Sequence, residues 1–99
     1  MTKDEEKMLF CLYGIFKEKN KTESKGSAKY ITNSEITEKC NAVFHSEDID
    51  DILSDLESGG YISEDSLGGV TLEKKSLEFV ENRPKEKLKD VADFLSKFF

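Results

Sequence analysis

The apolar positions between residues 46 and 58 repeat with the period of an α-helix. Four of them recur at spacings of three and four: Ile49, Ile52, Leu53 and Leu56. This spacing places the four side chains along one stripe of a helix. Ser46 suits the N-cap, and Gly59-Gly60 ends the pattern because glycine enters the left-handed turn at little steric cost. The pattern therefore predicts an amphipathic helix over residues 46–58.

A second helical pattern covers residues 4–18. One face carries the apolar stripe Met8, Leu9, Leu12, Ile15 and Phe16. Phe10, Cys11 and Tyr13 add apolar surface on other sides, so this helix is apolar nearly all round. A helix of that kind is usually covered on two faces, so we expect a second packing partner for it.

The segment that follows, residues 17–29, is polar and basic. It reads KEKNKTESKGSAK and holds five lysines against two glutamates. We expect a loop there, with two alternatives for its use. It is either a solvated, mobile connector, or the one basic patch of an acidic chain, available to a phosphate backbone.

Three short apolar runs predict a small antiparallel sheet. Residues 30–32 form the first strand, and residues 61–62 and 70–72 form a hairpin around the glycine-containing turn 65–69. The first strand leads into a capping box, with Thr32 as the cap and Glu35 reaching back, which predicts a helix that ends near residue 41. Residues 41–45 then form the turn before the helix at 46–58.

Two helices are expected after the hairpin, over residues 73–82 and 84–99. Pro84 suits the first turn of the second helix. Its apolar seam consists of Leu88, Val91, Leu95 and Phe98. Either this helix folds back on the first helix, or it pairs with a second subunit. We favour a homodimer whose interface joins the seam to Phe10 and Tyr13, because a small domain that exposed both surfaces would carry a large apolar patch.

The stretch "LESGGYI", a glycine-rich turn and then "VTLEKKSLEFVE" resemble the recognition helix, wing and following helix of winged helix-turn-helix domains. The resemblance spans residues 3–82. It implies an α+β fold: a winged helix with a three-helix core, a small antiparallel sheet with its wing, and in this chain a further C-terminal helix. Such domains usually bind duplex DNA as transcriptional regulators, and a substantial minority serve as protein-interaction modules.

Composition narrows the function classes. Ninety-nine residues suggest one domain, and the formal charge of −6 has the wrong sign for a generic nucleic-acid binder. Cys11 and Cys40 lack metal-type spacing and no catalytic motif is present, so we expect no metal site, no cofactor, no small-molecule substrate and no enzyme activity. The uncharged run 8–16 is too short for a membrane span and no signal peptide is visible, so we expect a cytoplasmic protein without a membrane partner.

The predicted helix over residues 46–58 is unsuited to the major groove. Its outer face holds six acids and no base: Glu47, Asp48, Asp50, Asp51, Asp55 and Glu57. Each acid close to a phosphate costs about 1 kcal/mol even in water, before desolvation is counted. Any DNA contact would therefore be directed at the backbone.

Two hypotheses remain open, and the usual role of the family puts the DNA-associated one first, with the interaction module as the alternative. In the first, a dimeric regulator contacts duplex DNA through its lysines: Lys17, Lys19, Lys21, Lys25, Lys29, Lys74 and Lys75. In the second, the chain is a protein-interaction module that presents acids to a basic partner protein: Glu47, Asp48, Asp50, Asp51 and Asp55.

Overall fold

The computed structural model describes residues 1–83, 93 and 96–97. Helices and strands alternate along the described residues: α1 (Lys3–Lys19), α2 (Lys25–Ala28), β1 (Tyr30–Ile31), α3 (Asn33–Cys40), α4 (Ser46–Ser58), β2 (Ile62–Glu64), β3 (Val70–Leu72) and α5 (Lys74–Glu81). The fold is therefore α+β, as predicted. The final helix expected over residues 84–99, with Leu88, Val91, Leu95 and Phe98, lies outside the described residues.

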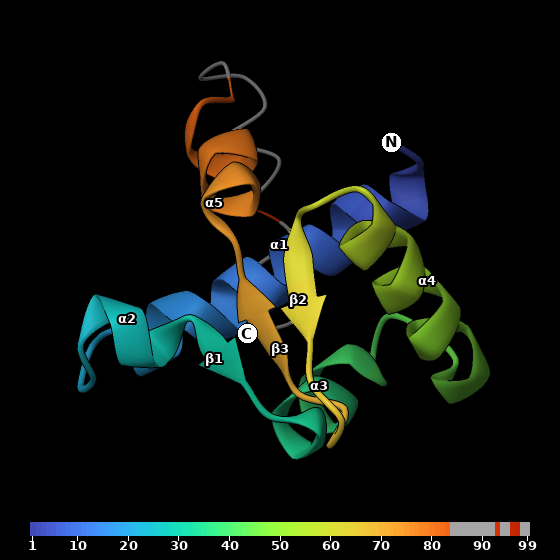
Figure 1. The fold of residues 1–99 in the computed structure, drawn as a ribbon, viewed down its shortest axis with the longest axis horizontal. Helices are drawn as coiled ribbons and strands as arrows, with labels where there is room; N and C mark the ends of the chain where they lie inside the picture. Colours follow the sequence, from blue (N-terminus) through green and yellow to red (C-terminus); the bar gives the residue numbers. More distant parts are fainter. Residues whose placement is uncertain (84–92, 94–95, 98–99) are drawn as a thin grey trace.

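The three strands form one antiparallel sheet in the order β1-β3-β2 (Figure 1). Tyr30 pairs with Thr71 across β1 and β3, and Ile62 pairs with Leu72 across β2 and β3. This confirms the three-stranded sheet and the hairpin predicted from the apolar runs. The strands turn alternate side chains inward, so Ile31, Ile62, Val70 and Leu72 are buried.

The core is built around α1, which crosses behind the sheet in Figure 1 and contacts α3, α4 and α5. Its predicted apolar stripe is buried, and so are Phe10 and Cys11 on its other sides. Thr2 caps the helix, because its hydroxyl accepts from the Glu5 N–H while the Glu5 carboxylate accepts from the Thr2 N–H. A second packing partner was predicted for this helix because it is apolar nearly all round, and other elements of the same chain provide the contacts.

The prediction of a structureless loop over residues 17–29 is wrong in part. α1 continues to Lys19, and Lys25–Ala28 forms the short helix α2. Ser24 begins α2 by accepting a hydrogen bond from the Ser27 N–H at 3.2 Å. A side-chain cap of this kind satisfies a backbone N–H that would otherwise lack a partner, which favours a helical turn in a polar segment.

The N-cap of α4 also differs from the prediction. His45, not Ser46, holds the capping position, and its side chain makes no capping hydrogen bond. The His45 carbonyl already accepts from the Asp48 N–H at 3.0 Å, so Ser46 is the first residue of the helix and not its cap. The acidic first turn remains, where Glu47 and Asp48 suit the positive end of the helix dipole.

The end of α4 follows the prediction from Gly59-Gly60. Gly60 has φ +80°, the Gly60 N–H donates to the Glu57 carbonyl, and the Tyr61 N–H donates to the Leu56 carbonyl. These two bonds form a Schellman ending, which needs a left-handed residue at the position of Gly60. The chain then leads directly into β2, so α4 and β2 are held in a fixed relation.

Candidate interaction surfaces

The outer face of α4 is one continuous set of exposed carboxylates. We call it the acidic surface, and it consists of Glu47, Asp48, Asp50, Asp51, Asp55 and Glu57, all exposed. The opposite face of the same helix holds Ile49, Ile52, Leu53 and Leu56, all buried. The predicted division of α4 into an apolar inner stripe and an acidic outer face is confirmed.

Among the described residues, the acids of the acidic surface form no ion pair. The last turn of α4 contains no basic residue, although Asp55 and Glu57 lie toward the negative end of the helix dipole. Helix capping therefore explains the first acids of α4 but not the last two.

The negative potential of α4 reaches the neighbouring strand β2. The Glu64 N–H donates to Glu57 Oε2 at 2.7 Å, which ties β2 to α4. Burial raises the pKa of the Glu64 carboxyl, and repulsion from Glu57 and Asp50 raises it further. Glu64 Oε1 is buried without a hydrogen-bond partner in the described residues. Glu64 thus places a partly buried carboxyl group of the hairpin beside the acidic surface.

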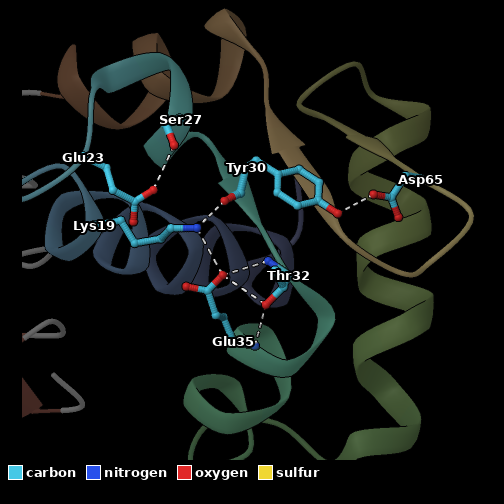
Figure 2. A network of polar contacts seen from close by, with 7 residues as sticks. All are labelled: Lys19, Glu23, Ser27, Tyr30, Thr32, Glu35 and Asp65. Carbon is cyan, nitrogen blue, oxygen red and sulfur yellow. Dashed lines mark hydrogen bonds and ion pairs between the residues drawn. The ribbon is translucent and has the colours of Figure 1, made fainter.

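The lysine segment, residues 17–29, is partly built into the fold. Lys19 Nζ donates to the Tyr30 carbonyl at 2.5 Å and to Glu35 Oε1 at 3.1 Å, with only 16% of its side chain exposed (Figure 2). Burial alone would raise the pKa of Glu35, but hydrogen bonds from Thr32 and Lys19 outweigh it and lower that pKa. Lys19 therefore joins α1 to β1 and α3, and it is less accessible to a partner than the exposed lysines of the predicted set.

The other lysines of this segment are more accessible. Lys17, Lys21 and Lys25 are exposed and Lys29 is half-buried. Lys21 forms an ion pair with Glu18 at 3.2 Å in which both side chains are mostly exposed. Exposed pairs of this kind add little stability and are readily exchanged for another partner. Three lysines at the end of α1 and the start of α2 can therefore meet an anionic partner.

Lys74 and Lys75 begin α5 and lie apart from the lysine segment, since α5 and α2 occupy different ends of the fold in Figure 1. Lys75 Nζ donates to the Gly59 carbonyl at 2.7 Å and sits 4.4 Å from the centre of the Tyr61 ring. Lys74 pairs with Glu78 at 3.6 Å on the exposed side of the helix. The seven predicted lysines thus do not form one patch.

α4, which carries the acidic surface, and α2, which belongs to the lysine segment, lie on opposite sides of the sheet in Figure 1, with α4 at the right and α2 at the left. The lysines of the DNA-binding hypothesis in residues 17–29 and the acids of the protein-interaction hypothesis therefore belong to separate parts of the fold.

The residues proposed for a dimer interface on α1 have contacts within their own chain. Phe10 is 8% exposed, and the Arg83 guanidinium lies 4.9 Å from the centre of its ring. The Tyr13 hydroxyl donates to Glu81 Oε2 at 3.0 Å, and burial beside this carboxylate raises the Tyr13 pKa to about 12. These contacts come from the end of α5, which joins α1 in the same subunit. The homodimer stays a prediction.

The turn of the hairpin holds a residue that the sequence pattern did not single out. Leu67 is 82% exposed, although it is apolar. The carboxylate of Asp65 fixes the turn around it, because Oδ1 accepts from the N–H groups of Leu67 and Gly69, each at 2.9 Å, and Oδ2 accepts from the Tyr30 hydroxyl at 2.5 Å (Figure 2). The sequence did contain one signal for Leu67, because it is an apolar residue inside an otherwise polar turn.

Two further features complete the chemistry of the described residues. A pocket of about 200 Å³ between α1 and α3 has a mixed charged lining: Ile15, Glu18, Lys19, Glu35, Glu38 and Lys39.

Cys11 and Cys40 are both buried free thiols, and the hydrogen bond with Cys40, together with burial, raises the Cys11 pKa. Among the described residues, no group of three or more His, Cys, Asp or Glu side chains could hold a metal ion. None of the helices in these residues is long and apolar enough to cross a membrane.

Comparison with known proteins adds no relative: no family model, no curated protein and no solved structure matches the chain.

Proposed function

We propose that the chain is a winged-helix domain used as a protein-interaction module. The order of its elements supports the scaffold: helix, strand, two helices and then a hairpin, with β3 between β1 and β2. In this proposal α3 and α4 are the helix-turn-helix, β2 and β3 are the wing, and α2 is an addition between the first helix and the first strand.

One observation carries the functional part: the outer face of α4, which would be the recognition helix, is exposed, acidic and without ion pairs in the described residues. In a DNA-binding winged helix this face offers donors to base edges inside a groove lined by phosphates. Six carboxylates there repel phosphates by about 1 kcal/mol each in water, which the serines of α4 could not offset. The same face attracts lysine and arginine.

The partner in this proposal is a basic protein segment. Opposite charges speed the encounter and exclude wrong partners more than they strengthen the final complex. Binding should therefore weaken steeply with salt, because exposed charges are screened over about 10 Å at 0.1 M. A complex with this origin forms in solution and needs no membrane, in line with the proposed cytoplasmic location.

The exposed lysines favour a second candidate, in which the chain contacts the backbone of duplex DNA. Lys17, Lys21 and Lys25 are the members of the predicted set that remain exposed in the lysine segment. Contacts through three lysines would be insensitive to sequence and lost at moderate salt. The proposed homodimer belongs with this candidate, since two copies would double the number of phosphate contacts.

Fluorescence anisotropy of two labelled probes separates the candidates at about 50 mM and higher salt, the range over which phosphate contacts lose most of their strength. The probes are a lysine-rich peptide and a short DNA duplex. An α4 variant combines Asp50→Asn, Asp51→Asn and Asp55→Asn, and a matched control combines Lys17→Gln, Lys21→Gln and Lys25→Gln.

The proposal expects saturable peptide binding that is lost in the α4 variant and kept in the lysine variant. Duplex binding that is lost only in the lysine variant, with no peptide binding, would replace it with the second candidate. Circular dichroism of both variants shows whether the fold is retained.

A further inference from the structure

The exposed Leu67 is not explained by the packing of its own chain. It is 82% exposed, while the apolar residues of the two strands beside it, Ile62, Val70 and Leu72, are buried. A single exposed leucine needs no explanation by itself. The turn that carries Leu67, however, has several fixed hydrogen bonds.

Asp65 holds this turn in one shape. Its carboxylate accepts from the Leu67 and Gly69 N–H groups and from the Tyr30 hydroxyl, and its own N–H donates to the Gly69 carbonyl at 2.9 Å. Gly68 takes the left-handed conformation at φ +83°. These bonds join the tip of the hairpin to the neighbouring strand, so Leu67 is presented on a preorganised turn.

The backbone of Gly69 fits closely under Tyr30. A Cβ on Gly69 would come within 2.4 Å of the Tyr30 hydroxyl oxygen, which is closer than real Cβ atoms approach another atom. The turn therefore requires glycine at this position if the Tyr30–Asp65 hydrogen bond is to form. A side chain displayed on an ordered turn loses little conformational entropy when a partner covers it.

The hairpin is also joined to the acidic surface. β2 contacts α4, and the Glu64 N–H donates to Glu57 Oε2 at 2.7 Å. Leu67 follows Glu64 by three residues at the tip of the same hairpin. The turn that carries the exposed leucine thus follows directly from the strand that contacts the acidic helix.

We propose that Leu67 is the apolar anchor of the α4 interaction surface, and that the partner is a basic protein segment carrying an apolar residue that covers Leu67. This inference rests on the proposed function, because the acidic surface supplies the charge complementarity. Binding energy in protein interfaces concentrates in a few apolar or aromatic side chains, while charged residues around them set specificity. Leu67 supplies the anchor, and α4 supplies the charged surroundings.

The test uses two synthetic peptides of equal length and equal lysine content. One carries leucines between the lysines, and the other carries serines at those positions. Anisotropy measures the affinity of each peptide for the full chain, for Leu67→Ser, and for Ser66→Ala as a control on the same exposed turn. Both positions are exposed, so circular dichroism should show unchanged folding.

The unmodified chain should bind the leucine peptide about tenfold more tightly than the serine peptide, the gain expected when part of a leucine side chain is covered. Leu67→Ser should abolish this preference, and Ser66→Ala should retain it. Equal affinity for the two peptides, or a preference that survives in Leu67→Ser, overturns the inference.

The combined variant Asp50→Asn, Asp51→Asn and Asp55→Asn separates this failure from failure of the proposed function. If neutralising α4 weakens both peptides but the leucine preference is absent, only the anchor is wrong. If neutralising α4 leaves both affinities unchanged, or if neither peptide binds, the proposed function fails and the inference falls with it.

Discussion

The outer face of α4 and the lysine segment carry opposite excess charge, and they differ in how many of their charges form ion pairs within the chain. Lys19 is drawn into the interface between α1, β1 and α3, where it pairs with Glu35, and Lys21 pairs with Glu18 at the surface. The acids of α4 take part in no ion pair of the described residues. One positive charge of the lysine segment, that of Lys19, is used to assemble the fold, whereas all six acids of the outer face of α4 face solvent.

This difference indicates which surface is available for recognition. Acids four residues apart on a helix, such as Asp51 and Asp55, repel each other and cost a few tenths of a kcal/mol per pair. Nothing in the described structure recovers this cost, so α4 would be more stable with mixed charges. A single-sign, unpaired face is expected of a surface that meets an oppositely charged partner.

The largest effect should distinguish the two faces of α4 from each other. Leu56 is fully buried, so Leu56→Ala should lower the free energy of unfolding by about 2–5 kcal/mol through lost burial and the cavity left behind. Asp55 precedes Leu56 in the sequence and lies on the exposed face of α4, so Asp55→Ala should change the free energy of unfolding by no more than about 0.5 kcal/mol. Urea unfolding measures both; similar losses would show that the outer face is also structural.

The next effect compares one glycine of the hairpin with one glycine of the lysine segment. Gly69→Ala forces the exposed Tyr30 hydroxyl aside and breaks its hydrogen bond with the Asp65 carboxylate, so it should destabilise the fold by about 1–3 kcal/mol. A Cβ on Gly26, in α2, meets nothing within 4 Å, so Gly26→Ala should cost nothing or stabilise slightly. Thermal unfolding of the two variants measures the difference, and equal melting temperatures would refute the close fit under Tyr30.

A third prediction divides the lysine segment itself. Lys19→Met keeps the side-chain stem but removes the ammonium from the Tyr30 carbonyl and from Glu35, so it should cost about 1–3 kcal/mol. Lys17→Met alters an exposed residue and should change stability by about 0.5 kcal/mol at most. A loss confined to the Lys17 variant would contradict the assignment of Lys19 to the fold.

The smallest expected effect is the pH dependence of folding stability that comes from Glu64, the carboxyl group beside the outer face of α4. Burial and the nearby carboxylates Glu57 and Asp50 raise the pKa of Glu64 above its ordinary value of 4.5. The folded state then holds its proton more tightly than the unfolded state, so this group favours folding below pH 4.5 and loses that contribution as pH rises through the raised pKa. Glu64→Gln should therefore stabilise the chain relative to the parent at neutral pH, with a gain that shrinks on acidification.

Glu35 provides the opposite control on the lysine side. Hydrogen bonds from Thr32 and Lys19 lower its pKa below the ordinary 4.5 despite partial burial. Its contribution to stability is present above pH 4.5 and is lost as pH falls through the lowered pKa. Glu35→Gln should thus destabilise the chain at neutral pH and approach the parent on acidification. Unfolding curves of the two variants with the same sign of change would contradict this account of the charges.

Much of the fold could be predicted from local signals in the sequence. The period of Ile49, Ile52, Leu53 and Leu56 identified the buried face of α4, and Gly59-Gly60 located its end. Thr32 and Glu35 formed the predicted capping box. These signals are local because helix stripes, caps and glycine endings act over at most a few turns.

The parts that sequence could not supply depend on contacts between distant residues. Whether Lys19 is exposed depends on Tyr30 and Glu35, eleven and sixteen residues away. The fixed shape of the turn around Leu67 depends on the hydrogen bond between Tyr30 and Asp65, thirty-five residues apart. Composition counted all lysines of residues 17–29 alike, whereas the tertiary structure uses one of them internally.

The central claim is that the outer face of α4, and not the lysine segment, is the recognition surface. Amide chemical-shift mapping of the isotope-labelled chain during titration with a lysine-rich peptide tests it most directly. We predict shifts concentrated in residues 46–58 and in β2, with residues 17–29 unchanged and with no shift in residues 46–58 when duplex DNA replaces the peptide. Duplex-induced shifts along residues 46–58, or peptide-induced shifts confined to residues 17–29, would contradict the claim.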